Sequence, residues 1–276
     1  AAPAHRKADR MKDTSPARPG APGAQRARPI ETAELVLQHG SVSIDELVEQ
    51  TGVSLMTVYR DIATLEEAGL LQRHRGKVSA LATGLHEASA MFRMEQQQGT
   101  KRAMAEVVAR HITPRSSLLI DDSTSGVFVI RALRDRTPVT VVTNSLLAAQ
   151  ETAGDPDLNL FVLGGSNQGW ANSMLGPTTL SNLADIDGDF CVISASGLAH
   201  GRCYHPYEDV VAVKRAMLDA ARTKFLMLDH TKMTRRALHA FATLEEFDLV
   251  VVDHQTSAEA VEQLQEWGAT VEVAAP

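Results

Sequence analysis

The sequence predicts an α/β protein with two folded parts: a small helical domain with a wing, and a larger, mostly parallel α/β domain. Residues 43–81 contain two short helices joined by a tight turn and followed by a basic β-hairpin. From residue 116 onward, short continuous apolar runs alternate with helical stretches. A chain of 276 residues is long enough for two domains, each with its own core.

The first of the two helices is predicted to begin after Ser43, because Glu46 follows three residues later and completes a capping-box signature. Gly52 can take the positive φ that ends this helix, and Ser54 can cap the next one. The apolar positions of the first helix are Ile44, Leu47 and Val48, and those of the second are Leu55, Val58, Ile62 and Leu65, up to Gly69.

Two helices joined by a short turn that contains glycine have the helix-turn-helix geometry, whose second helix enters the major groove of DNA. Residues 30–39 should form a further helix that packs on this pair through Ala33, Val36 and Leu37, with Gly40 ending it. Residues 70–74 and 77–81 can pair as strands around Arg75-Gly76 and form a wing. We therefore assign residues 30–82 to a winged helix-turn-helix domain.

Charge is distributed unevenly along the chain. The net charge of −7 excludes a protein that simply coats nucleic acid, and residues 83–276 are acidic. Residues 1–29 carry seven Lys/Arg and two Asp/Glu without an apolar period, so we expect a disordered basic tail, either lying along DNA or simply solvated. The chain does not begin with Met, and Met11 is a candidate start. The winged domain is acidic overall, but one face can be positive, since its basic residues are Arg60, Arg73, Arg75 and Lys77.

Hydropathy and cysteine content limit the location. No apolar run approaches the length that spans a bilayer, and the N-terminus lacks an apolar signal-peptide core. Two cysteines, Cys191 and Cys203, give no disulfide framework. We expect a cytoplasmic protein with no membrane partner.

Residues 83–115 are predicted to form a linker helix region. The segment from His86 to Ile112 is helical in pattern, and residues 96–99 break that pattern. It is also a candidate for dimer contacts. Its apolar markers are Ala88, Met91, Phe92, Met104, Val107 and Val108.

Residues 116–276 are predicted to form a Rossmann-like α/β domain. Near-continuous apolar strands that alternate with helices are typical of a mostly parallel sheet covered on both faces. The predicted strands are 118–120, 139–142, 158–163, 190–193, 225–228 and 249–252, with an edge strand near 270–273. The predicted helices include 146–152, 210–221 and 258–267.

Five of these strands end in small hydroxyl, amide, glycine or acidic residues. In open α/β sheets ligands bind outside the carboxyl ends of the strands, and open backbone N–H groups there suit a phosphate or a polyol. Lys214 and Lys232 could supply the countercharge. Any single loop of this kind could simply cap a helix. The five ends are residues 121–126, 143–145, 164–167, 194–197 and 229–232.

These segments also resemble a known family. VSLMTVYRDIATLEEAGLLQR resembles the N-terminal domain of DeoR-type transcriptional repressors. The ordered set LIDDSTS, VVTNS, LGG, LGP, SASG, AVKRAM and LDHTK resembles the C-terminal effector domain of the same family. The resemblance covers roughly residues 30–255. It implies a repressor of carbohydrate metabolism genes that responds to a sugar phosphate and has a sensor with the fold of sugar-phosphate isomerases. It implies no cofactor, no metal and no catalytic residue.

The resemblance and the predicted elements together give two sets of contact residues. We expect Arg60 to reach guanine or phosphate and Thr57 a thymine methyl or phosphate, while the wing mainly neutralises phosphates. The expected partners are a double-stranded DNA operator, a phosphorylated sugar and further copies of the chain in a homo-dimer or tetramer. The DNA-binding set is Ser54, Met56, Thr57, Tyr59, Arg60, Arg73, Arg75 and Lys77. The effector-binding set is Asp121, Ser123, Thr124, Ser125, Asn144, Ser145, Gly164, Gly165, Lys214 and Lys232.

The sequence departs from the family pattern at three places. Tyr59 stands where the family usually has the first arginine of an Arg-Arg-Asp run. The wing has RHRGKVSA where the family often shows His-Gly-Gly-Ala. Ser123 and Ser125 stand where Gly and Thr are usual, and serine tolerates positive φ less well than glycine.

Three alternatives stay open on the sequence alone. An isomerase or hydrolase of phosphorylated sugars could use Asp121, Asp122, Glu208 and Asp209 as acid/base carboxylates, although these could equally cap helices or bind a ligand's hydroxyls. His200, Cys203 and His205 could form a metal site. Trp170 could be a sugar-stacking lid or a packed anchor, and residues 204–208 (YHPYE) are similarly ambiguous.

Overall fold

The computed structural model of the protein describes residues 41–67, 70–74, 76–80, 87, 90–133, 136–233 and 235–276, and before them Pro29, Thr32, Ala33, Leu35 and Val36. The predicted basic tail up to residue 28 lies outside the described residues. So do the predicted helix end at Gly69, the wing tip at Arg75 and the end of the second wing strand at Leu81.

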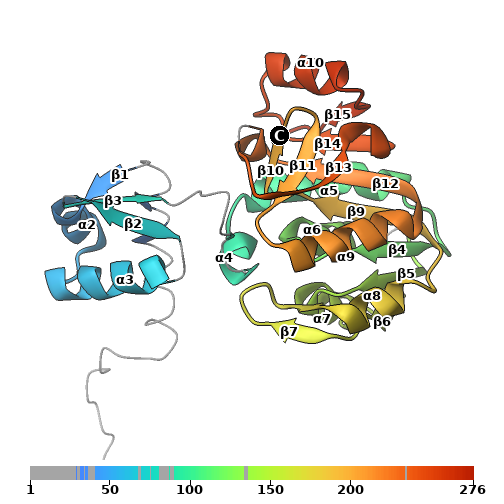
Figure 1. Cartoon of the computed structure of the whole chain (residues 1–276), viewed down its shortest axis with the longest axis horizontal. Helices are drawn as coiled ribbons and strands as arrows, with labels where there is room; N and C mark the ends of the chain where they lie inside the picture. Colours follow the sequence, from blue (N-terminus) through green and yellow to red (C-terminus); the bar gives the residue numbers. More distant parts are fainter. Residues whose placement is uncertain are drawn as a thin grey trace, which may run out of the picture.

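The N-terminal part contains the predicted helix-turn-helix and wing (Figure 1). Its elements are β1 (Ser41–Ser43), α2 (Ile44–Thr51), α3 (Leu55–Glu67), β2 (Leu71–His74) and β3 (Lys77–Ala80). The predicted capping box is confirmed, since the Ser43 N–H donates to Glu46 Oε2 at 2.8 Å and the Glu46 N–H donates to Ser43 Oγ at 3.2 Å. Gly52 ends α2 with φ 66°.

The sequence does not predict two features of this part. Strand β1 pairs antiparallel with β3, so the two wing strands belong to a three-stranded sheet with the order β1-β3-β2, in which β3 is the central strand. Of the four apolar positions at helical spacing, Val58, Ile62 and Leu65 are buried, but the Leu55 side chain is 46 % exposed. In the predicted first helix, the described residues are helical, and Ala33 and Val36 are buried.

Two helices precede the large sheet, α4 (Ala90–Glu95) and α5 (Gln98–His111). The predicted break between them is confirmed at Gln96 and Gln97, but Gln98 and Gly99 already belong to α5. Met91, one of the predicted apolar markers of this segment, is 55 % exposed. By contrast, Met104, Val107 and Val108 of α5 are buried in the core that α5 shares with α6 and α7.

The main sheet has seven strands in the order β15-β14-β12-β9-β4-β5-β6, and every neighbouring pair is parallel. This confirms the predicted mostly parallel α/β domain and its edge strand. The strands are β4 (Ser117–Ile120), β5 (Val139–Thr143), β6 (Leu158–Val162), β9 (Gly188–Ser194), β12 (Ala221–Leu228), β14 (Leu249–Val252) and β15 (Val271–Val273).

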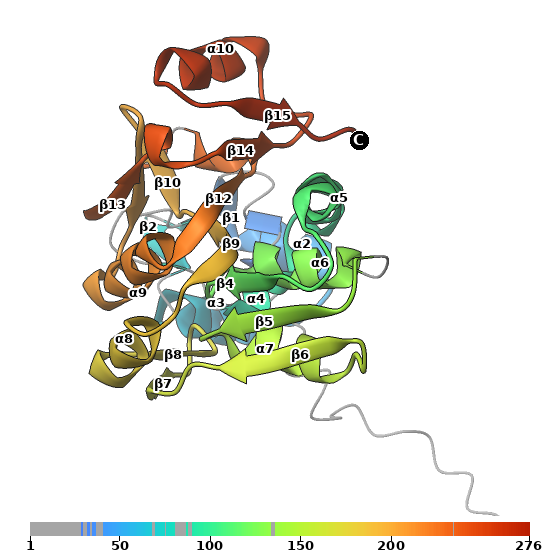
Figure 2. The same cartoon turned by 90° about the vertical axis from the view of Figure 1, so that its right-hand side faces the viewer.

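Helices cover the sheet from both sides (Figure 2). Helices α5, α6 (Thr124–Ala132) and α7 (Leu146–Ala153) pack on one face. On the other face lie α8 (Pro177–Leu183), α9 (Glu208–Asp219) and a small antiparallel sheet, while α10 (Ala258–Glu266) lies beside β15. Successive side chains of a strand point to opposite faces of the sheet. Accordingly, in β4, Leu118 and Ile120 pack in the core beneath α5, α6 and α7, and Leu119 packs in the core beneath α8 and α9.

The remaining elements are short. The small antiparallel sheet consists of β10 (Gly197–Ala199), β11 (Arg202–His205) and β13 (His239–Thr243), and a hairpin of β7 (Ser166–Gln168) and β8 (Ser173–Leu175) follows β6. Two 3-10 turns, η1 (His230–Lys232) and η2 (Leu244–Glu246), complete the chain.

Two sequence expectations fail at the sheet. Strand β6 is not covered on both faces, because Phe161 is 51 % exposed and Val162 is 43 % exposed. The helix predicted to reach Ala221 ends at Asp219, because Ala221 pairs with Gly188 and begins β12. None of the described helices is long and apolar enough to cross a membrane.

Candidate functional site

The start of α3 is fixed by Ser54, one of the predicted DNA-binding residues. Its Oγ accepts a hydrogen bond from the Thr57 N–H at 3.3 Å and lies 2.9 Å from Thr57 Oγ1. This is the predicted helix cap. Both hydroxyls therefore hold the first turn of α3 in place, and Thr57 is half-buried beside it.

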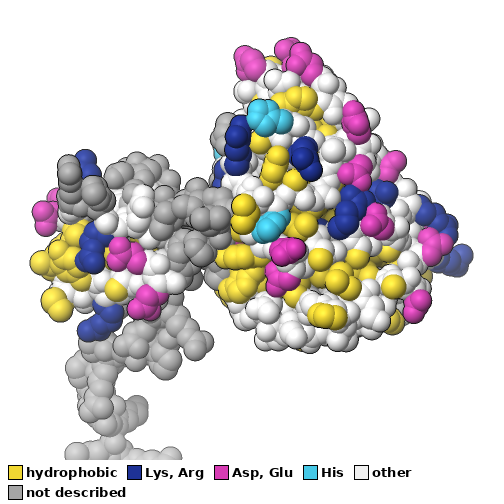
Figure 3. All heavy atoms as spheres, viewed as in Figure 1, with side chains coloured by type: hydrophobic (Ala, Val, Ile, Leu, Met, Phe, Trp, Pro, Cys, Tyr) yellow, Lys and Arg dark blue, Asp and Glu magenta, His cyan; other side chains and the backbone are white. Residues whose placement is uncertain are grey.

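The outward face of α3 carries large side chains. Met56 is 71 % exposed and Tyr59 is 36 % exposed, and Leu55 and Arg60 are exposed on the same side. Residues four apart are neighbours on a helix surface, so Met56 lies next to Arg60 and Leu55 next to Tyr59. Hydrophobic side chains lie next to Lys and Arg on this part of the surface (Figure 3). Exposed apolar groups beside a cation suit a DNA groove, where they contact thymine methyl groups. Leu55 belongs to this face, although it shares the helical spacing of the buried residues Val58, Ile62 and Leu65.

The wing is tied to α3 through Arg73. Its guanidinium lies 5.5 Å from the centre of the Tyr59 ring, and its Nη2 is 3.7 Å from Glu66 Oε2. The Arg73 N–H also donates to Glu66 Oε1 at 2.8 Å. Tyr59, which replaces the usual arginine of the family, therefore packs against a wing arginine. Lys77 is exposed at the start of β3, and Arg75 lies outside the described residues.

In the large domain, nine of the ten predicted effector residues follow the carboxyl ends of β4, β5, β6 and β12, and the tenth, Lys214, lies on α9. The chain runs from β4 outward to β6 and then returns to β9 on the other side of β4, so β4 and β9 flank the point where the strand order reverses. Ligands of open α/β sheets bind at such a point.

Asp121 and Lys214 form the buried centre of this edge. Asp121 Oδ1 accepts from the Ser123 N–H at 3.0 Å, and its Oδ2 accepts from the Ser194 N–H at 3.3 Å and from Lys214 Nζ. Lys214 Nζ also lies 3.3 Å from Asp122 Oδ1 and donates to Ser194 O at 3.1 Å. Burial alone would lower the pKa of Lys214, but the two carboxylates raise it above its ordinary value. The charge of Lys214 is thus balanced inside the protein.

Four buried oxygen atoms at this edge have no hydrogen-bond partner among the described residues. They are Asp122 Oδ2, Ser123 Oγ, Asn144 Oδ1 and Ser173 Oγ. Asn144 Nδ2 donates to Met174 O at 2.9 Å, which fixes the amide beside β8. Buried polar groups are nearly always hydrogen-bonded, so these atoms indicate where a ligand with hydroxyl groups could bind.

Positive charge gathers beside these oxygens. Lys101 Nζ donates to Arg93 O, and Thr124 Oγ1 at the start of α6 donates to the same carbonyl at 3.5 Å. Burial lowers the pKa of Lys101 to about 7, and the positive charges of Arg93 and Lys232 act in the same direction. Burial also lowers the pKa of Lys232, with Arg235 and Arg93 contributing. We call Arg93, Lys101, Lys232 and Arg235 the cation cluster.

Two members of the cation cluster, Arg93 and Lys101, lie beside the start of α6, where Ser123 is the N-cap with φ −70°. The position therefore needs no glycine, and the departure from the family pattern at Ser123 costs no backbone strain. The N-terminus of a nine-residue helix favours an anion. Sequence reasoning identified Lys232 but not Arg93, Lys101 or Arg235, since no motif surrounds them.

Other predicted contacts have structural partners. Ser145 caps α7, accepting from the Ala148 N–H at 3.3 Å. The Gly164 N–H donates to Asn182 Oδ1 at 3.0 Å, and Gly164 O accepts from Thr179 Oγ1 at 2.7 Å. At Gly165, where φ is 150°, a Cβ atom would lie 2.2 Å from Thr179 Oγ1. Close packing therefore explains the glycine at Gly165 alone, because a Cβ atom at Gly164 would lie at an ordinary contact distance of 3.5 Å from Asn182 Oδ1.

Two of the carboxylates considered for acid/base catalysis, Glu208 and Asp209, are exposed in the first turn of α9, where acidic residues stabilise the helix. Among the described residues, no three His, Cys, Asp or Glu side chains gather so as to hold a metal ion. Of the proposed ligands, Cys203 is buried, and burial raises the pKa of its thiol. His205 is also buried, and burial lowers its pKa to about 4.

Trp170 is a packed anchor. Its ring lies 4.7 Å from that of Tyr207 and 6.5 Å from that of His205, measured between centroids. Its carbonyl accepts from the Ala90 N–H at 2.7 Å, so the loop before β8 holds the start of α4. The tract 204–208 is therefore part of an aromatic cluster at the edge of the site.

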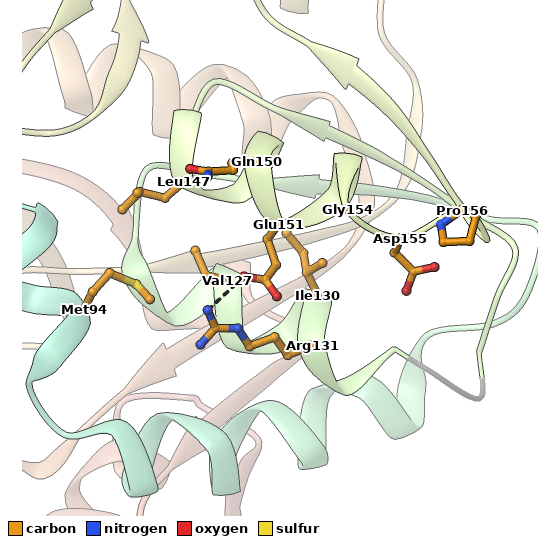
Figure 4. Close-up of a pocket in the computed structure, with 10 residues that line it drawn as sticks. All are labelled: Met94, Val127, Ile130, Arg131, Leu147, Gln150, Glu151, Gly154, Asp155 and Pro156. Atoms are coloured by element: carbon orange, nitrogen blue, oxygen red, sulfur yellow. Dashed lines mark hydrogen bonds and ion pairs between the residues drawn. The ribbon is translucent and has the colours of Figure 1, made fainter. Parts of the chain in front are cut away.

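A separate hollow of about 680 Å³ lies between α4, α6 and α7. It is lined by Met94, Val127 and Leu147 among others, and the ion pair of Arg131 and Glu151, 2.8 Å long, crosses it (Figure 4). None of the predicted effector residues lines it.

Comparison with known proteins gives matches to both parts. Residues 28–83 match the family described as DeoR-like helix-turn-helix domain, and residues 96–254 match the DeoR C terminal sensor domain. The HTH-type transcriptional repressor CsqR of Escherichia coli is 31% identical over 76% of this chain and 79% of its own length. The glycerol-3-phosphate regulon repressor of Escherichia coli is 31% identical over 80% of this chain and 87% of its own length. The transcriptional repressor AccR of Agrobacterium fabrum is 28% identical over 83% of this chain and 90% of its own length.

Proposed function

We propose that this protein, which belongs to the DeoR family of DNA-binding transcriptional regulators, represses carbohydrate metabolism genes and is controlled by a phosphorylated sugar. As a member of this family it is a regulator and not an enzyme. Asp121 and Asp122, considered above as acid/base carboxylates, instead hold Lys214.

On the DNA side, the outward face of α3 enters the major groove. Arg60 reads a base edge or a phosphate, and Leu55 and Met56 offer apolar contact to thymine methyl groups. Arg73 and Lys77, with Arg75, neutralise phosphates and position the domain without reading sequence. A dimer or tetramer would match an operator with two half-sites. We expect the protein to act in the cytoplasm, where such an operator lies.

On the effector side, the four unpaired buried oxygens next to the cation cluster carry the proposal. The phosphate of the ligand would bind at the start of α6, near Ser123, Thr124 and Ser125, with countercharge from Lys101 and Lys232. The hydroxyl groups of the sugar would donate to Asp122 and Asn144, both of which have an acceptor oxygen to spare. Lys214 would orient the loop through Asp121 and need not touch the ligand. The name of one relative, the glycerol-3-phosphate regulon repressor, supports a small phosphorylated polyol as the ligand class.

The test is a thermal-shift panel of phosphorylated sugars, each paired with its unphosphorylated parent. A specific ligand at a hundred times its Kd should stabilise the protein by about 2.7 kcal/mol. Asn144→Ala should abolish this shift, and Asn159→Ala, at an exposed position on β6, should preserve it. If no phosphorylated sugar shifts the unfolding temperature more than its parent does, the ligand class is wrong.

A second measurement tests regulation. DNA fragments selected from a random pool by the protein would supply an operator. The active ligand should change the Kd for that operator and leave unrelated DNA unaffected. An unchanged Kd at saturating ligand would contradict control by that ligand.

A further inference from the structure

Glu87 links the effector site to the segment that leads back to the DNA-binding part. It is the described residue that follows the stretch 81–86, and its side chain is buried, with 8 % exposure. Its carboxylate accepts a hydrogen bond from Ser196 Oγ, at the carboxyl end of β9. Its N–H donates to Tyr207 Oη at 3.4 Å. Three residues on, the Ala90 N–H donates to Trp170 O at 2.7 Å.

The Glu87 carboxylate is an anion placed among the cations of the effector site. Burial would raise its pKa, but Lys232, Arg93 and Arg235 and the Ser196 hydroxyl outweigh burial and lower it to about 2. Three members of the cation cluster therefore already face a negative charge that the protein itself provides. A phosphate bound at the start of α6 would compete for the same cations.

We propose that the Glu87 carboxylate holds the anion position of the effector site until a phosphate displaces it, and that its release is the signal passed to the DNA-binding part. This inference rests on the proposed function, because it assumes that the effector is an anion. Once the carboxylate leaves Ser196, the segment before α4 loses this side-chain hydrogen bond, while the backbone N–H groups of Glu87 and Ala90 can still donate to Tyr207 and Trp170. The binding of a phosphate would thereby loosen the segment before α4, which leads back to the DNA-binding part.

The proposal requires competition between an internal and an external anion. When the binding-competent state is only partly populated, the apparent Kd equals the intrinsic Kd divided by the populated fraction, and binding is weakened accordingly. Removing the charge at Glu87 should therefore tighten the binding of a phosphate. Allosteric couplings typically change affinity by about 5- to 150-fold, and we expect a decrease in Kd within this range.

The experiment measures the binding of inorganic phosphate to the full chain by titration calorimetry, at constant ionic strength. Glu87→Gln should bind phosphate about 5- to 150-fold more tightly than the unaltered protein. Glu106→Gln is the matched control, since it makes the same charge change at an exposed position on α5 and should leave the Kd unchanged. Ser196→Ala loosens the carboxylate without removing it and should also tighten phosphate binding, which keeps the test open if Glu87→Gln folds poorly.

Hydrogen-exchange mass spectrometry over residues 81–90 gives the second readout. Phosphate should speed exchange in the unaltered protein and in Glu106→Gln, whereas Glu87→Gln should exchange fast with or without phosphate. If the unaltered protein binds phosphate and Glu87→Gln and Ser196→Ala bind it equally or more weakly, the inference fails and the proposed function stands. If neither the unaltered protein nor any variant binds phosphate or a phosphorylated sugar, both fail.

Discussion

Replacing Lys214 with methionine should strongly destabilise the α/β domain at neutral pH. Lys214, Asp121 and Asp122 are all buried, with side-chain exposures of 3 % or less. Methionine fills a similar volume but leaves two carboxylates facing each other without a cation. Breaking a buried ion pair by removing one partner costs about 3–5 kcal/mol. For a domain of this size that corresponds to a fall in unfolding temperature of roughly 6–20 °C.

The pH dependence follows from the signs of the pKa shifts. In the unaltered protein burial raises the pKa of Asp122, but Lys214, Arg93 and His205 lower it overall. Its stabilising contribution is present above the unfolded pKa of about 3.9 and is lost as the pH falls through the lower folded value. In Lys214→Met the carboxylates should instead have raised pKa values, so acid stabilises the folded variant. The stability difference between the two proteins should therefore narrow between pH 7.5 and pH 5.

Urea unfolding followed by tryptophan fluorescence is the appropriate assay, because the only two tryptophans of the chain, Trp170 and Trp267, both lie in the α/β domain. Adding Asp121→Asn to Lys214→Met should recover part of the loss, since one of the two stranded charges is removed. Arg222→Met, a surface control, should leave stability close to that of the unaltered protein. A difference under about 1 kcal/mol at pH 7.5, or one that does not narrow in acid, would refute the reasoning.

Three further predictions concern other parts of the chain. Arg60→Ala should weaken operator binding by about 1–3 kcal/mol and relax sequence specificity. Lys77→Ala should weaken binding to all DNA sequences alike and reduce the slope of log K against log salt concentration by about 1. Equal effects of Arg60→Ala on binding to operator and to random DNA in a gel-shift series would contradict the role of Arg60. Gly165→Ala should cost more than about 1 kcal/mol of stability, because φ is 150° and the new Cβ would meet Thr179; Gly169→Ala, with nothing within 4 Å, is the control in urea unfolding. The two cysteines are buried with raised pKa values, so a thiol reagent should label them only after denaturation, and rapid labelling of the native protein would count against their burial.

The regular elements were largely predictable because their signals are local. Ser43 and Glu46 specify a helix start within four residues, and the continuous apolar runs of β4 and β14 specify buried parallel strands. Leu55 shows the limit of periodicity. It has the spacing of a core residue, yet it lies in the first turn of α3, with half of its side chain exposed. The pattern gives a helix face but not where along the helix the packing begins.

The rest depends on contacts between distant residues. Strand β1 has only three residues and exists because Ser41 and Ser43 pair with β3. The small sheet joins Cys203 to Ala242, again without a local signal. In the effector site the loops at the strand ends were predictable from their composition, and their specific contacts stay predictions. Glu87 could not be predicted, since 109 residues separate it from Ser196.

The strand order also determines when the effector site can form during folding. Strands β4, β5 and β6 follow one another with α6 and α7 between them, so this half of the sheet needs only local contacts. Strand β9 must return to pair with β4. Ser117 of β4 and Asp189 of β9 are 72 residues apart, and hydrogen bonds of 2.9 Å between them stabilise this pairing. Pairing over such a separation is slow compared with local pairing. Asp121 and Ser194 meet where β4 and β9 pair, so the proposed effector site is complete only after the sheet has closed, and we expect a nascent or half-folded chain not to respond to a ligand.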